Sequence, residues 1–188
     1  MDLKTLRFAD SAPYPAPETD GHNPRYATAI LSNIGAVNSE MSAVSLYFYN
    51  SLITKKFFPD IAQCFHHISI VEMHHMNLFG ELALNLGTDP RLWSYNRGHM
   101  NYWSPSSNRY PSNIAALVSN SLSGEQDAIR KYQAQISWIE DENIKALLKR
   151  IIADEEIHVS IFKSILTELG VTMQVQELDD PPTEIPSE

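Results

Sequence analysis

The sequence predicts an all-α protein, a four-helix bundle in which a long crossover joins two antiparallel helical hairpins. Four long segments place apolar residues three and four positions apart, as helices that face a core do. Two of the links between segments are short, whereas the middle connection, 88–111, is about two dozen residues long. In addition, the two halves of the chain repeat one pattern of charged and aromatic residues.

The short links define the two hairpins. Residues 57–60 separate the first two segments and residues 139–141 separate the last two, so each pair is expected to run antiparallel. Asp60 is the expected N-cap of the second segment, and Gly87 is its expected C-terminal cap. The first segment carries its apolar stripe on Ile30, Ile34, Val37, Met41, Val44 and Phe48. The expected helices cover about 26–55, 60–87, 112–138 and 141–170.

Three segments outside these helices differ in composition. Residues 1–25 contain four prolines and little periodicity, which predicts an extended N-terminal arm beside the 26–170 bundle. Residues 171–188 form an acidic, proline-rich tail that is expected to be disordered. The aromatic crossover 88–111 is expected to cover a bundle surface or a subunit interface, with a substrate entrance as the alternative.

Composition narrows the class of protein. A length of 188 residues fits one domain with tails, and a net charge of -9 argues against a nucleic-acid partner. The single cysteine, Cys64, excludes an internal disulfide or a CxxC metal site. No apolar run approaches the ~18 residues of a membrane span, and the N-terminus lacks a signal-peptide core. We therefore expect a cytoplasmic protein with no membrane partner.

The internal repeat carries the functional prediction. Glu72 and His75 form an ExxH pair that matches Glu155 and His158 at a shift of 83 residues, and a phenylalanine and a Leu-Gly pair follow at the same shift. A lone glutamate precedes each ExxH pair, by 32 residues in one half and 30 in the other. These glutamates are Glu40 and Glu125, and Tyr47 and Tyr132 follow them at equal distance.

The spacing of the repeat gives it a chemical meaning. Residues three apart share one helix face, so each ExxH pair can direct a carboxylate and an imidazole at one point. Four carboxylates and two imidazoles form a ligand set that suits iron or manganese, with zinc as a common substitute. Four glutamates also balance two divalent ions, whereas inward carboxylates without metal would be costly to bury. A single ExxH pair or a lone glutamate is common on the solvated face of a helix. Two ExxH pairs in register, each preceded by a lone glutamate, are poorly explained in that way.

These residues identify a resemblance. The E…ExxH…E…ExxH pattern resembles that of the ferritin-like superfamily, in particular its rubrerythrin, bacterioferritin and manganese-catalase branches, over about residues 26–170. The resemblance implies two metal ions per chain. It implies that Glu72 and Glu155 bridge them, that Glu40 and Glu125 are terminal ligands, and that His75 and His158 each bind one ion.

The chain also departs from these branches. Ala128 stands where rubrerythrins usually carry a further glutamate, and their rubredoxin-like cysteine domain is missing from the sequence given. No haem-binding methionine of the bacterioferritin kind can be assigned. The bare six-residue set is compatible with manganese catalases, although the chain is short for that branch.

Three residues near the expected ligands are candidates for supporting roles in catalysis. Tyr47 and Tyr132 either complete the core with satisfied hydroxyls or bind ligand carboxylates and gate the site. Asp154 is expected to accept the second N–H of a histidine from the other ExxH pair, although Asn77 or a backbone carbonyl would serve equally well. His74 and Glu156 are expected to turn aside, because neighbouring helical residues differ by about 100°.

A bridged pair of metal ions acts on small oxidants, so hydrogen peroxide or dioxygen is the expected substrate. The leading hypothesis is an enzyme that removes peroxide, either as a dimanganese catalase or as a di-iron peroxidase with an external electron donor. The alternatives are a ferritin-type protein that oxidises and stores iron, and a structural ferritin-like protein stabilised by metal. A homo-oligomer is expected in each case.

Overall fold

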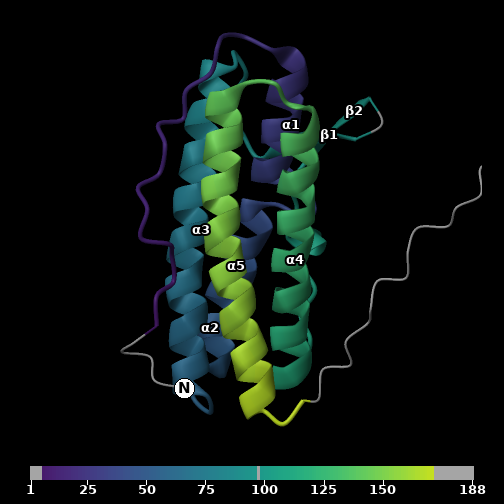
Figure 1. Ribbon diagram of the computed structural model, residues 1–188. Coiled ribbons are helices and arrows are strands. Elements are labelled where there is room, and N and C mark those ends of the chain that lie inside the picture. Colours follow the sequence, from purple (N-terminus) through teal and green to yellow (C-terminus); the bar gives the residue numbers. More distant parts are fainter. Residues whose placement is uncertain (1–5, 97, 172–188) are drawn as a thin grey trace, which may run out of the picture.

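The computed structural model describes residues 6–96 and 98–171 (Figure 1). The long helices form a bundle, and the expected hairpins are present: α2 packs antiparallel to α3, and α4 to α5. The predicted four-helix bundle is therefore confirmed, with a small hairpin of strands added to it. The elements are α1 Pro24–Gly35, α2 Glu40–Thr54, α3 Pro59–Asn85, β1 Trp93–Asn96, β2 His99–Tyr102, the 3-10 turn Pro105–Ser107, α4 Ile114–Trp138 and α5 Glu142–Glu168.

The core consists of two apolar clusters at opposite ends of the bundle. Phe79 and Ile151 belong to the cluster near the α4–α5 link, whereas Phe65 and Phe162 belong to the cluster at the other end. Helices α3 and α5 contribute to both clusters, and their ExxH pairs lie between the two apolar stretches. The polar site is thus enclosed by apolar packing on both sides along the bundle axis.

The prediction of one continuous helix over 26–55 is wrong. The chain breaks after Gly35 and resumes at Glu40, because the crossover packs where the helix would continue. A Cβ on Gly35 would lie 2.4 Å from the backbone nitrogen of Trp93, so only glycine fits there. The Lys131 ammonium of α4 donates to the carbonyl of Asn38 inside the break, at 2.9 Å. As a result Val37 is 71% exposed rather than a core residue.

Phe48 was likewise expected in the core stripe, but it is 61% exposed. The break changes the phase of the helix, so that α2 buries Glu40, Leu46 and Tyr47 instead. A continuous periodic pattern concealed this change because both halves of the segment are apolar. The break therefore decides which face of α2 meets the bundle interior.

The helix ends match the sequence in one case and not in another. Gly87 has a positive φ of 84°, and the amides of Gly87 and Thr88 close the C-terminal turn of α3 on the carbonyls of Leu84 and Ala83. The expected N-cap Asp60 is wrong, because α3 begins one residue earlier at Pro59, and Asp60 lies in its first turn. Proline favours the first helical position, where its missing N–H costs nothing.

The crossover contains a hairpin that the sequence did not predict. Strands β1 and β2 pair antiparallel, with Trp93 opposite Tyr102, beside α1. Trp93 packs on the core, and the Trp103 indole donates to the Ser42 hydroxyl of α2 at 2.9 Å. The crossover thus covers a bundle surface, which was one of the expectations for it.

The N-terminal arm lies along the bundle. Residues 6–23 form neither helix nor strand and run beside α3 and α5 before α1 begins (Figure 1). The first five residues of the arm lie outside the described residues, and so does all of the predicted acidic tail except Val171. Within 6–96 and 98–171, no helix is long and apolar enough to cross a membrane.

Candidate metal centre

The structure brings all six predicted ligands together at the middle of the bundle. Each is at most 2% exposed, and each lies on the helix face that the repeat predicted. Helices α2 and α4 each supply a lone glutamate, and helices α3 and α5 each supply an ExxH pair. The six residues are Glu40, Glu72, His75, Glu125, Glu155 and His158.

The six side chains form two overlapping groups of possible metal ligands. One group is Glu40 with His75 and the other is Glu125 with His158, and Glu72 and Glu155 belong to both. Within each group the ligand atoms lie within 4.8 Å of one another. Sharing of two carboxylates between two groups is the arrangement that a dinuclear site requires.

Both histidines direct the same ring nitrogen at the carboxylates. His75 Nδ1 lies 3.1 Å from Glu155 and 3.4 Å from Glu72. His158 Nδ1 lies 2.9 Å from Glu155 and 3.0 Å from Glu72. The Nε2 atoms point away from the centre, so Nδ1 is the atom that either ring offers to a metal.

Several buried atoms of the centre have unmet bonding capacity. Glu72 Oε1, His75 Nδ1 and Glu155 Oε1 are buried and make no well-aligned hydrogen bond, although opposing imidazole and carboxylate atoms lie 3.0 to 3.1 Å away. Unsatisfied buried polar atoms are rare, and a bound cation would satisfy all three. The residues therefore fit a pair of metal ions, on the chemistry of the donor atoms and on their lack of well-aligned hydrogen bonds.

The protonation of the metal-free centre follows from its crowding. Burial and then repulsion from Glu72 and Glu155 raise the pKa of Glu40 well above its usual range, and the same causes raise the pKa of Glu125. Burial alone would lower the pKa of His75, but nearby carboxylates, Glu155 first, raise it well above its usual range.

The other ExxH pair is affected in the same way. Burial by itself lowers the pKa of His158, but hydrogen bonds and charge from Glu155 and Glu72 raise it well above the ordinary value. Burial opposes ionisation of Glu72, yet hydrogen bonds from His158 and His75 place its pKa well below the usual range. The crowded carboxylates therefore favour the protonated forms of the two imidazoles and, together with burial, of the outer glutamates in the metal-free centre.

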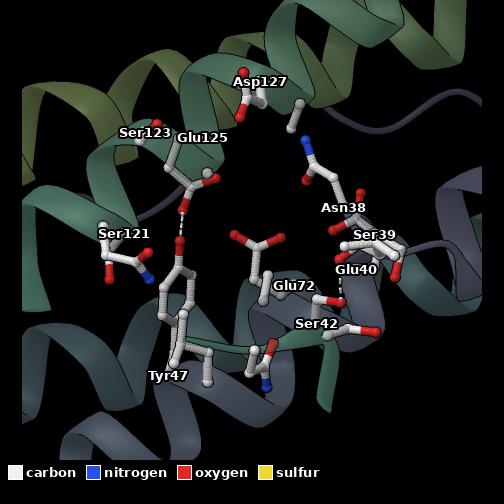
Figure 2. Close-up of a pocket in the computed structure, with 18 of the residues that line it drawn as sticks. Asn38, Ser39, Glu40, Ser42, Tyr47, Glu72, Ser121, Ser123, Glu125 and Asp127 are labelled. Atoms are coloured by element: carbon white, nitrogen blue, oxygen red, sulfur yellow. Dashed lines mark hydrogen bonds between the residues drawn. The ribbon is translucent and has the colours of Figure 1, made fainter. Parts of the chain in front are cut away.

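The two tyrosines bind the lone glutamates across the bundle. The Tyr47 hydroxyl of α2 donates to Glu125 of α4, and the Tyr132 hydroxyl of α4 donates to Glu40 of α2. Figure 2 shows Tyr47 and Glu125 joined in this way, with Glu72 between Glu125 and Glu40. Each tyrosine thus holds the glutamate of the other half of the repeat. The contact is the one expected of a residue that orients a metal ligand.

Asp154 contacts a histidine of the other ExxH pair, as the sequence suggested. Its Oδ2 accepts a hydrogen bond from His75 Nε2 at 3.0 Å, and its Oδ1 accepts one from Arg150 at 2.6 Å. Burial disfavours its charge, but hydrogen bonds from His75, Tyr14 and others lower the pKa of Asp154 to about 2. A charged acceptor therefore faces the outer nitrogen of His75.

The outer nitrogen of His158 has a partner that no sequence pattern indicated. His158 Nε2 donates to the backbone carbonyl of Phe8 at 2.9 Å. A backbone acceptor leaves no mark in side-chain spacing, so only the docked arm reveals it. Arg150 could have been suspected, because it precedes Asp154 by four residues on one helix face.

A cavity reaches the centre from the side opposite the arm. It has a volume of about 260 Å³ and is lined by all four glutamates, but neither histidine is among its lining residues. Its walls come from α2, α4, the helix break and residues 107–109 of the crossover, which thus also borders the route into the centre. Figure 2 shows Asn38, Ser39 and Asp127 among the lining residues. Small molecules can therefore approach the carboxylates while the histidine side is covered.

The neighbours of the ligands turn away as predicted. His74 and Glu156 are both exposed, although each directly adjoins a ligand in sequence. His67 lies eight residues before His75 on α3, and its ring stacks on the Phe8 ring at a centroid distance of 4.8 Å. None of these three side chains reaches the centre.

The fold is ferritin-like, and the two buried carboxylate and histidine groups are consistent with a dinuclear metal site. The rubrerythrin family model matches residues 34–166. The chain belongs to the rubrerythrin family. A search of curated proteins found no match.

Solved structures share this fold at low sequence identity. KatB, a manganese catalase from Anabaena, is 21% identical with a TM-score of 0.77, over 95% of this chain and 88% of that one. The Rhodobacter capsulatus bacterioferritin is 21% identical with a TM-score of 0.66, over 79% and 88%. A Bacteroides fragilis bacterioferritin-related protein, described as a dodecameric thioferritin, is 20% identical with a TM-score of 0.62, over 79% and 89%.

Proposed function

We propose that this protein is a dinuclear iron or manganese oxidoreductase that removes hydrogen peroxide. The observation that carries the proposal is a buried set of four glutamates and two histidines, which a small cavity lined by the glutamates reaches from the surface. Glu72 and Glu155 would bridge the ions, Glu40 and Glu125 would complete them at the cavity side, and His75 and His158 would each bind one ion. When bound, such a pair supplies two-electron redox chemistry between divalent and trivalent states.

The residues of the chain have separable tasks in this proposal. The four glutamates balance the charge of two divalent ions, which keeps the net charge of the site nearly constant. Tyr47 and Tyr132 hold Glu125 and Glu40 in place through their hydroxyls, and each hydroxyl can also pass a proton to or from its carboxylate. Apolar clusters on both sides exclude bulk water, which leaves the cavity as the route for peroxide.

Metal analysis followed by peroxide turnover tests the proposal. Protein purified without oxygen should contain about two iron or manganese ions per chain, and loaded protein should consume peroxide. Oxygen release at half the molar rate of peroxide loss indicates a catalase. Peroxide loss that requires an added electron donor indicates a peroxidase. Fewer than one ion per chain after loading, together with no turnover, would overturn the assignment.

The same preparation separates this function from iron storage. A storage protein would oxidise many ferrous ions per chain and elute as a very large particle on size-exclusion chromatography. Phe48 and Leu52 leave an apolar strip exposed on α2, one turn apart, so a homo-oligomer is expected in either case and its size distinguishes the two functions. Retention of hundreds of iron atoms per particle would favour storage instead.

A further inference from the structure

The N-terminal arm contacts the outer side of both histidines in the centre. Phe8 reaches His158 directly through its carbonyl, at 2.9 Å from Nε2. Asp10 and Tyr14 reach His75 through Asp154: the Asp10 amide donates to Oδ1 at 2.6 Å and the Tyr14 hydroxyl donates to Oδ2. Both outer nitrogens of the centre therefore depend on one extended segment of the chain.

Arg150 fastens this segment to the bundle. Its guanidinium donates to the carbonyls of Ala12 at 2.7 Å and Asp10 at 2.9 Å, and also to Asp154 at 2.6 Å. The same group lies 4.0 Å over the ring of Tyr14. One buried cation thus ties the arm and the partner of His75 into a single network.

These contacts determine which nitrogen faces the metals. A backbone carbonyl can only accept, so His158 must carry its proton on Nε2 and present a bare Nδ1 when neutral. The Asp154 carboxylate imposes the same tautomer on His75. Outer partners of metal-bound histidines set ring orientation in this way, and their loss typically weakens metal binding by about 10- to 100-fold.

We propose that residues 6–14 of the arm are a working part of the metal centre, and that docking of these residues and binding of the metals strengthen each other. This rests on the proposed dinuclear centre, and it makes Arg150, Tyr14 and the Phe8 carbonyl positioning groups for the histidines. Coupling between two sites is reciprocal. Bound metal must therefore strengthen docking of the arm by the same factor as the docked arm raises the affinity for metal.

Manganese binding by full-length variants tests one direction of this coupling. Arg150→Met removes the link to Ala12, Asp10 and Asp154, and should weaken Mn²⁺ binding by about 10- to 100-fold. Tyr14→Phe keeps the ring and removes one hydrogen bond, so a loss of about fivefold is expected. Asn85→Ala is the matched control, because its amide holds the arm at the Pro17 carbonyl, away from the histidines. It should leave Mn²⁺ affinity within about twofold of wild type.

Hydrogen exchange of the arm tests the other direction, without any measurement of activity. The Asp10 amide is bonded to Asp154, so it exchanges only when the arm lifts. Loading the wild-type protein with Mn²⁺ should slow exchange in the arm peptide at least tenfold, and Arg150→Met should abolish that slowing.

Two results would overturn the proposal. One is equal arm exchange in metal-free protein and in protein that holds two Mn²⁺ ions. The other is wild-type Mn²⁺ affinity in both Arg150→Met and Tyr14→Phe. A wild-type protein that binds no Mn²⁺, Fe²⁺ or Zn²⁺ would instead overturn the dinuclear centre itself.

Discussion

Metal loading should release protons from the centre, up to four per chain. In the metal-free centre the pKa values of His75, His158, Glu40 and Glu125 are all raised well above their ordinary values. Each group must lose one proton to bind a metal through Nδ1 or a carboxylate oxygen. Two imidazoliums and two carboxyl groups therefore exchange four positive charges for the four of two divalent ions, and the net charge of the buried site is unchanged.

The size of the effect follows from this count. Two protons displaced per ion make the apparent affinity for each ion rise by about 100-fold for each unit of pH, until the groups lose their protons in the free protein. Calorimetric titration with Mn²⁺ in two buffers of different ionisation enthalpy measures the proton number directly. Chelator competition at pH 6 and pH 7 measures the change in affinity.

Two neighbouring histidines provide a matched comparison. His75→Gln removes a buried imidazolium and should lower both affinity and proton count, whereas His74→Gln alters an exposed ring and should change neither. Release of fewer than about two protons per chain, or affinity that is flat between pH 6 and pH 7, would refute the protonation scheme.

Three further predictions test the site, its charge and its entrance. Glu72→Gln should prevent tight binding of both ions, whereas Glu40→Gln should weaken the binding of mainly one ion. Metal stoichiometry measured by mass spectrometry distinguishes the two variants. Equal loss of metal in both would contradict the bridging role of Glu72. The metal-free protein should lose stability from pH 6 to pH 8, because a group whose pKa is raised by folding stabilises the folded state fully only below its pKa in the unfolded chain. The expected loss is about 1.4 kcal/mol per pH unit for each proton that the folded state alone retains. Urea unfolding that shows rising stability over this range would contradict the prediction. Gly124→Leu should narrow the cavity and reduce peroxide turnover about tenfold or more without loss of metal. Gly124→Ala is the control and should retain turnover, because a Cβ at this position meets nothing within 4 Å. Full activity in the leucine variant would show that peroxide enters elsewhere.

The repeat could be recognised from the sequence because the spacing of residues in a helix determines the direction in which their side chains point. Glu72 with His75 and Glu155 with His158 share a helix face whatever their surroundings, so the ligand pairs and the two hairpins could be predicted. The tyrosines followed the same logic, but their crossed pairing, Tyr47 with Glu125, depends on how two helices face each other.

Other features depended on contacts between segments far apart in the chain. The break before Glu40 arises because the crossover packs on Gly35, and periodicity within one segment carries no signal of that contact. The hairpin of β1 and β2 likewise formed in a stretch whose turn residues and aromatics fit several conformations.

The sequence by itself thus determined the bundle, its hairpins and the six side chains that meet at its centre, since each follows from local helical periodicity and an internal repeat. Only the tertiary structure decided the surroundings of that centre. The cavity opens where α2 starts after the break, and the arm closes the histidine side through a backbone carbonyl of Phe8 and the network around Arg150. Backbone acceptors and long-range packing have no local pattern, so the chain must fold before they can be seen.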